Sequence, residues 1–160
     1  MARSRRARLR DNGDVKLYLD ICCLKRPFDD QTQPRIRMET EAVLSLLGEG
    51  PSRFTFVRSV AHDLENDQNP VPWRAERVRA WLAARPVVEP QVEALRHRTA
   101  ELMASGVHGF DALHLACAEL AGAEVFVTCD DRLLAVAQRL GTTIKVRVGE
   151  LTAMAREVLS

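Results

Sequence analysis

Short apolar segments alternate along the chain with longer amphipathic ones, which predicts β-strands alternating with α-helices. The apolar runs predict strands at residues 16–22, 53–59, 124–129 and 144–148, with at most a very short edge strand between Pro86 and Pro90. Helical periodicity predicts helices over residues 33–48, 73–84, 91–104, 109–121, 131–140 and 150–159, and a short one that ends near Asn66.

Glycines predict where several of these helices end. Gly48 or Gly50 is expected to end the first long helix, and Gly122 to end the helix over 109–121. That later helix is apolar nearly all round, so we expect it to be deeply packed. The helix over 91–104 is amphipathic, and its buried face is expected to hold Val92, Leu95, Thr99, Leu102 and Met103.

A parallel sheet covered on both faces accounts for this alternation, so the predicted fold is α/β, a three-layer α/β/α sandwich with a short, mostly parallel central sheet. The 160 residues suit one domain, which we place at residues 15–160. Residues 1–14 form a basic arm with five arginines and almost no apolar content, expected to be disordered or loosely docked. Both an electrostatic grip on RNA phosphates and a plain solvated tail are consistent with this arm.

The composition is that of an ordinary globular protein, with 46% hydrophobic and 28% charged residues. The net charge of +1 excludes a strongly basic nucleic-acid binder for the chain as a whole, although not local patches. No apolar stretch is long enough to cross a bilayer and no secretory signal is present, so a cytoplasmic protein is expected. The cysteines form no C-x-x-C pair and accompany no histidine cluster, so a zinc site is not expected, and reduced, buried thiols are predicted at Cys22, Cys23, Cys117 and Cys129.

Four carboxylates from separate segments occupy positions that a divalent metal site would need. Asp20 and Asp130 close two predicted strands, Glu65 follows a third within two helical turns, and Asp111 opens a helix. Because ligands bind outside the carboxyl ends of parallel strands, these acids are expected to meet at one edge of the sheet. Converging acids repel one another, and a bound cation relieves that repulsion.

Each acid also has a simpler interpretation. Asp130 could serve only as the N-cap of the helix that follows it, and Asp111 could only favour the positive end of its own helix dipole. Glu65 could be a surface residue of a short polar helix. Asp20 is the hardest to explain in this way, because it ends a buried strand and no helix is predicted for it to cap.

A carboxylate cluster without histidine or cysteine suits Mg²⁺ or Mn²⁺, which prefer oxygen ligands. Such ions polarise phosphate groups and lower the pKa of bound water, so the cluster predicts metal-dependent hydrolysis of phosphodiester bonds. A separate amino-acid nucleophile is then unnecessary.

Four segments resemble the PIN-domain ribonucleases, the family that includes VapC-type toxins. They are Tyr18-Leu-Asp20, the segment from Ser59 to Glu65, Phe110-Asp-Ala-Leu-His-Leu-Ala116 and Val127-Thr-Cys-Asp-Asp131. They occur in the family's order between residue 16 and about residue 150. The segments over residues 18–31 and 35–42 are similar to one bacterial subgroup of PIN proteins.

This resemblance implies roles for individual residues. Asp20, Glu65, Asp111 and Asp130 would be the catalytic, metal-binding acids, with Asp131 as an alternative to Asp130. Thr128 and Ser59 would support the site. One departure concerns the residues after the first aspartate, where many family members have Ser, Thr or Asn and this chain has Ile21-Cys22-Cys23. A polar contact to Asp20 is therefore expected to be missing or supplied by the backbone.

Three arginines near Asp20 are candidates for gripping RNA phosphates, Arg26, Arg35 and Arg37. Arg35 with Glu39, and Arg37 with Glu41, are equally consistent with ion pairs on the surface of a helix. His114 lies one turn after Asp111 and could face the site, although a histidine in an apolar helix is more often a core residue.

The sequence thus predicts a Mg²⁺- or Mn²⁺-dependent endoribonuclease, acting as the toxin of a toxin–antitoxin pair. The expected partners are an RNA substrate, a small antitoxin protein and, from the resemblance alone, a second copy of the chain in a homodimer. Two alternatives are a PIN-like module that binds RNA or a protein without cutting, and a nuclease of RNA maturation.

Overall fold

The computed structural model describes residues 15–160, except for the side chains of residues 49–53, so the predicted basic arm lies outside the described residues. One parallel sheet has the order β2-β1-β3-β4 and consists of β1 (Val15–Leu19), β2 (Phe54–Phe56), β3 (Val125–Thr128) and β4 (Arg147–Glu150). The helices are α1 (Ile21–Lys25), α2 (Pro34–Arg53), α3 (Val60–Asp67), α4 (Pro72–Ala83), α5 (Val92–Ala104), α6 (Gly109–Leu120), α7 (Asp131–Leu140) and α8 (Leu151–Leu159), with short 3₁₀ turns at Arg26–Phe28 and Gly141–Thr143.

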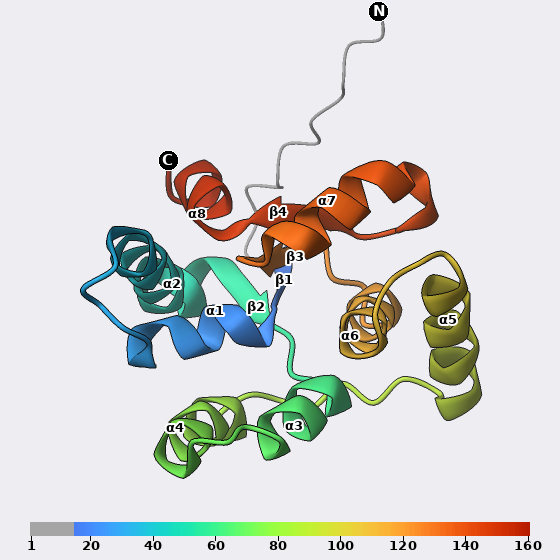
Figure 1. Ribbon diagram of the computed structural model, residues 1–160, viewed down its shortest axis with the longest axis horizontal. Helices are drawn as coiled ribbons and strands as arrows, with labels where there is room; N and C mark the ends of the chain where they lie inside the picture. Colours follow the sequence, from blue (N-terminus) through green and yellow to red (C-terminus); the bar gives the residue numbers. More distant parts are fainter. Residues whose placement is uncertain (1–14) are drawn as a thin grey trace, which may run out of the picture.

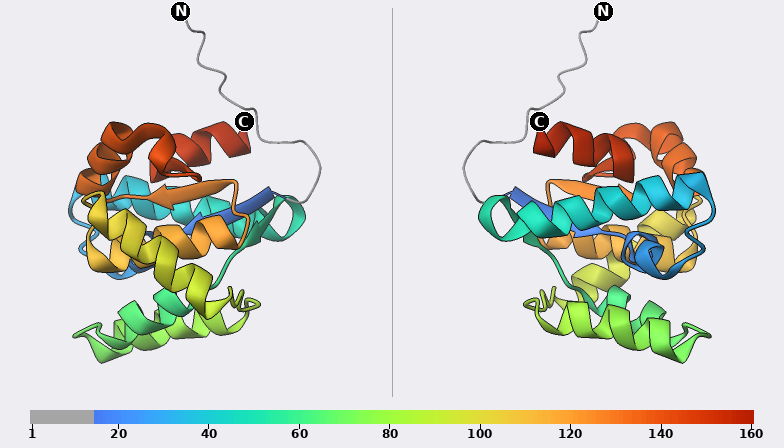
Figure 2. Two further views of the ribbon diagram at one scale, coloured as in Figure 1. Left: turned by 90° about the vertical axis from the view of Figure 1, so that its right-hand side faces the viewer. Right: turned by 90° about the vertical axis from the view of Figure 1, so that its left-hand side faces the viewer.

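Helices cover both faces of the sheet, because successive strand residues point to opposite sides. Leu17, Leu19 and Val127 belong to a hydrophobic core to which α2 and α8 contribute, whereas Tyr18 and Phe126 belong to a second core with α5, α6 and α7. Figures 1 and 2 show the two layers of helices with the strands between them, and the α3–α4 pair beyond the β2 edge of the sheet. The predicted α/β/α sandwich is confirmed.

The first two strands are shorter than predicted. β1 ends at Leu19, and α1 begins at Ile21, inside the segment predicted as strand. β2 pairs with β1 only over Phe54–Phe56, and Arg58 then forms a single parallel bridge with Val87. The edge strand expected between Pro86 and Pro90 is therefore one bridge long.

Glycine does not end α2, contrary to the prediction. The helix runs through Gly48 and Gly50 to Arg53, because a glycine inside a helix costs only about 1 kcal/mol and need not interrupt it. Gly122 does end α6, as predicted, and its φ of 73° is one that residues with a side chain rarely adopt.

Two predictions about apolar positions are wrong. Val92 and Met103 are 65% and 52% exposed, because α5 packs against α6 along a narrower face centred on Leu102. The last strand, β4, begins three residues later than predicted, because the apolar residues before it pack in the second core.

Within residues 15–160, no helix combines the length and apolarity that a membrane span requires.

Candidate functional site

Asp20 lies between the ends of β1 and β3 and is only 4% exposed. Its Oδ1 accepts a hydrogen bond from the Ile21 backbone N–H at 2.8 Å, and its Oδ2 accepts one from the Thr128 hydroxyl at 2.7 Å. The Cys22 thiol also donates to Oδ2, at 3.5 Å. Although residues 21–23 lack the Ser, Thr or Asn of many family members, Asp20 therefore keeps polar contacts. The Ile21 backbone, the Cys22 thiol and the Thr128 hydroxyl supply them.

The expectation that Asp20 has no helix to cap is wrong, since it is the N-cap of α1. This capping does not account for its burial. Burial raises the pKa of the Asp20 carboxyl well above its usual value, and the nearby Cys22 and Glu65 raise it further. A cation beside this carboxylate would relieve that electrostatic penalty.

Glu65 on α3 lies close to both Asp20 and His114. Ligand atoms of Asp20, Glu65 and His114 all lie within 4.8 Å of one another. Glu65 Oε2 is 2.6 Å from His114 Nε2, and the Tyr18 hydroxyl is 2.6 Å from both His114 Nδ1 and Ser59 Oγ. A buried chain of hydrogen bonds therefore runs from Ser59 through Tyr18 and His114 to Glu65.

The protons of this chain follow from its geometry. With His114 neutral, its Nε2–H donates to Glu65 and its Nδ1 accepts from Tyr18, which in turn accepts from the Ser59 hydroxyl. Burial raises the pKa of Tyr18 well above its usual value, so the phenol keeps its proton. Burial lowers the pKa of His114, but the hydrogen bond to Glu65 and the charges of Asp20 and Glu65 outweigh it, so the net shift is upward.

Asp111, the third residue of α6, is half-buried and outside the 4.8 Å group that contains Asp20. Burial raises the pKa of its carboxyl, and the negative charges of Asp130 and Glu65 add to the shift. No residue in the described part of the chain donates a hydrogen bond to this carboxylate. A half-buried acid without a donor is suited to a cation or to water.

Asp130 caps α7, as its simpler interpretation requires, and is also outside the 4.8 Å group. Its Oδ1 accepts from the backbone N–H groups of Arg132 and Leu133, at 2.9 and 3.4 Å. Among the described residues none donates to Oδ2, so one oxygen remains for a cation. Asp131 points elsewhere, because it receives two hydrogen bonds from Arg35, at 2.7 and 2.8 Å.

Two of the three candidate RNA-binding arginines are engaged within the protein. Arg26 and Arg35 both donate to Glu39, whose side chain is 2% exposed. The predicted pair of Arg35 with Glu39 is therefore present, and Arg26 is a second partner of the Glu39 carboxylate. Arg37, on the same helix, is exposed to solvent.

His62 lies behind the site with a defined tautomer. Its Nδ1 accepts from the Ser59 backbone N–H at 3.1 Å, so the proton sits on Nε2, which donates to the Leu19 carbonyl at 2.7 Å. The His62 ring stacks on Tyr18 with a centroid distance of 4.5 Å. Burial lowers the pKa of His62 from 6.5 to about 3, and a positive charge on His114 would act in the same direction.

The His62→Gln variant is expected to lose less free energy of unfolding than the wild type as the pH falls. The folded pKa lies below the unfolded one, so the stability held by neutral His62 is complete above about pH 6.5 and is lost as the pH falls toward 3. At about pH 5 the lost free energy of unfolding is about 2 kcal/mol. Urea unfolding of the wild type and of His62→Gln at about pH 7.5 and pH 5 measures this difference in free energy. Effects of pH that the two proteins share cancel in the comparison.

His97→Gln is the matched control, because the His97 side chain is 78% exposed. It should leave the pH dependence as in the wild type. Equal pH dependence for His62→Gln and wild type would contradict the assignment of a buried, neutral His62.

Sequence reasoning missed part of this network. It gave Tyr18 no role and favoured a core position for His114, which the structure shows to be both buried and bonded to Glu65. The three-residue spacing from Asp111 was the available signal for His114. No local signal existed for Tyr18, because its hydroxyl partners lie 41 and 96 residues away along the chain.

Comparison with known proteins identifies the fold family. The family model of the PIN domain matches residues 36–139, more than half of the chain. The matched segment contains Glu65, Asp111 and Asp130 and begins after Asp20. PIN domains are in general nucleases and typically depend on divalent metal ions. No curated protein matches the chain.

Proposed function

Because the chain belongs to the PIN-domain family, we propose that it is a Mg²⁺- or Mn²⁺-dependent endoribonuclease. The observation that carries the proposal is the meeting of Asp20 and Glu65 within 4.8 Å of His114, at the carboxyl edge of the sheet. The acids come from segments far apart in the chain, and packing alone gives no reason to gather them.

The residues present fit a hard divalent cation. Asp20, Glu65, Asp111 and Asp130 would hold it through carboxylate oxygens, the ligands that Mg²⁺ and Mn²⁺ prefer. The raised pKa values of Asp20 and Asp111, caused first by burial, show that their negative charge is disfavoured without a cation. When bound, such an ion polarises the phosphate and makes water a stronger nucleophile. Asp130 is favoured over Asp131 as the ligand, because Asp131 pairs with Arg35.

The chain's own residues prepare the site. Thr128 and the Ile21 N–H hold both oxygens of Asp20 in place, so this buried carboxylate has one orientation. The chain from Ser59 through Tyr18 and His114 holds Glu65 by Oε2. Glu65 Oε1 is then available to bind the cation, since the side chain is 27% exposed.

The substrate and partners follow from the surface and the resemblance. Arg37 is exposed, so it can approach an RNA phosphate, whereas Arg35 is engaged by Glu39 and Asp131. The resemblance of residues 18–31 and 35–42 to a bacterial subgroup of PIN proteins supports the role of toxin in a toxin–antitoxin pair. In this role the chain would bind a small antitoxin protein and form a homodimer in the cytoplasm.

Cleavage of a panel of single-stranded and hairpin RNAs tests the proposal. Cleavage is expected in the presence of Mg²⁺ or Mn²⁺. It should stop in EDTA and return when either ion is added back, because the bound cation is required for the reaction. Single-stranded DNA of the same sequence is the matched control and should be cut more slowly, because it lacks the 2′-hydroxyl. RNA binding without cleavage under every metal condition would instead favour the non-catalytic module.

A further inference from the structure

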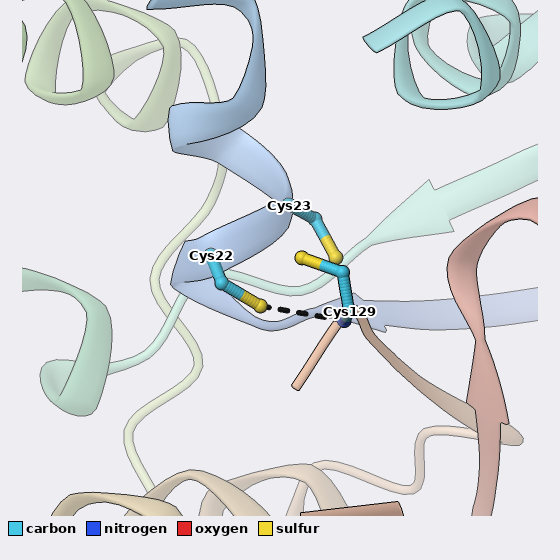
Figure 3. Close-up of side chains that lie close together, drawn as sticks. All are labelled: Cys22, Cys23 and Cys129. Atoms are coloured by element: carbon cyan, nitrogen blue, oxygen red, sulfur yellow. Dashed lines mark hydrogen bonds between the residues drawn. The ribbon is translucent and has the colours of Figure 1, made fainter. Parts of the chain in front are cut away.

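Three of the four cysteines meet beside the carboxylate site, which their spacing did not predict. Cys22 and Cys23 are neighbours on α1, and Cys129 follows β3 more than 100 residues later. Their sulfur atoms all lie within 4.8 Å of one another. Figure 3 shows the Cys22 and Cys23 side chains directed from α1 toward Cys129.

The backbone explains the meeting. The Asp20 N–H donates to the Val127 carbonyl at 2.8 Å, which ties the start of α1 to the end of β3. The Cys23 thiol donates to the same carbonyl at 3.4 Å, and the Cys129 N–H donates to Cys22 Sγ at 3.4 Å. The Val127 carbonyl thus contacts both Asp20 and Cys23, and the Cys22 sulfur contacts the backbone of Cys129.

The arrangement has the chemistry of a soft metal site. All three cysteines are free, and cysteine sulfur selects thiophilic ions such as Zn²⁺ and Cu⁺ over Mg²⁺. Around one such ion, sulfur atoms bound at about 2.3 Å would be about 4 Å apart, so modest side-chain movements would bring these three into coordination.

The site is shielded but reachable. Cys23 and Cys129 are 0% and 3% exposed, whereas Cys22 is half-buried and offers a path from solvent. The Cys22 sulfur also contacts Asp20 Oδ2 and Thr128 Oγ1, both at 3.5 Å. The sulfur and carboxylate sites therefore adjoin through one side chain while presenting different ligand chemistry.

We propose that Cys22, Cys23 and Cys129 form a binding site for one thiophilic metal ion, separate from the carboxylate site. Each thiol that becomes a ligand releases its proton to solvent, and water or an external thiol completes the coordination. Binding here requires neither RNA nor nuclease activity.

Titration of the reduced, metal-stripped full chain with Cd²⁺ tests the proposal without RNA. The expected result is an ultraviolet thiolate-to-metal charge-transfer band that saturates at one Cd²⁺ per chain and that excess Mg²⁺ does not remove. Cys22→Ser and Cys129→Ser should each weaken binding at least about tenfold. Cys117→Ala is the matched control, because this cysteine lies on α6 outside the group, and it should bind as the wild type does.

Other outcomes would overturn the proposal. Absence of the band in the wild type, or a band unchanged by both serine variants, would show that the sulfur atoms do not hold the ion. Loss of the band on addition of Mg²⁺ or in Asp20→Asn would show that the ion depends on the carboxylates, so that the two sites are not separate. Circular dichroism of each variant checks the fold, and Cys22→Ser keeps the test valid if a buried position fails to fold, because Cys22 is only half-buried.

Discussion

Asp20→Asn is expected to reduce metal-dependent RNA cleavage by at least about 100-fold, which corresponds to about 2.7 kcal/mol of transition-state stabilisation. The variant keeps the size and shape of the side chain, and its amide oxygen can still accept from Thr128. It removes the negative charge that would bind the cation and replaces one accepting oxygen by a donor, which could face the Thr128 hydroxyl oxygen if the amide oxygen capped Ile21. Asp111→Asn should behave similarly, because no described residue donates a hydrogen bond to the Asp111 carboxylate. Initial rates of cleavage with Mn²⁺ measure both effects.

Stability separates this loss of activity from misfolding. Burial raises the folded pKa of Asp20 above its unfolded value, so above the unfolded pKa the ionised carboxylate disfavours the metal-free folded state. Asp20→Asn should therefore be at least as stable as the wild type near neutral pH in EDTA. Added Mn²⁺ should stabilise the wild type more than the variant.

Asp67→Asn is the matched control for charge. Asp67 is the last residue of α3, and its side chain is 65% exposed. It should cleave RNA as the wild type does. Undiminished cleavage by both Asp20→Asn and Asp111→Asn would contradict the proposed metal site.

Glu39→Ala is expected to lower the free energy of unfolding by about 3 kcal/mol, the lower end of the range for breaking a buried ion pair. The Glu39 carboxylate accepts from Arg26 and, at 2.6 Å, from Arg35. Removing it leaves two guanidinium groups close together without their shared anion. The effect stays at the lower end because Arg35 is 55% exposed and retains Asp131 as a partner.

Urea unfolding of the variant measures the loss. Glu41→Ala is the control on the same helix, because Glu41 is exposed, and it should change the free energy of unfolding by less than about 0.5 kcal/mol. A loss equal to that of Glu41→Ala would show that Glu39 does not hold α2 against the 3₁₀ turn Arg26–Phe28.

Elements with signals at both ends were predicted best. α7 runs from Asp131 to Leu140 as expected, because Asp130 caps its start and Gly141 its end, and both signals are local. α1 was missed because its five residues, mostly apolar, are too few to show a helical period and continue the apolar run of β1. That error also produced the wrong expectation that Asp20 caps no helix.

The sequence by itself determined the class of fold and the edge of the sheet where the acids gather. Both depend on local periodicity and on the rule that parallel strands share one carboxyl edge. Only the tertiary structure decided which side chains meet there. In the folded protein Glu65 is hydrogen-bonded to His114, which contacts Tyr18. Asp131 pairs with Arg35, and three cysteines lie together beside Asp20. These contacts link residues that are tens of positions apart, and their geometry depends on how helices pack on the sheet, which no local pattern encodes.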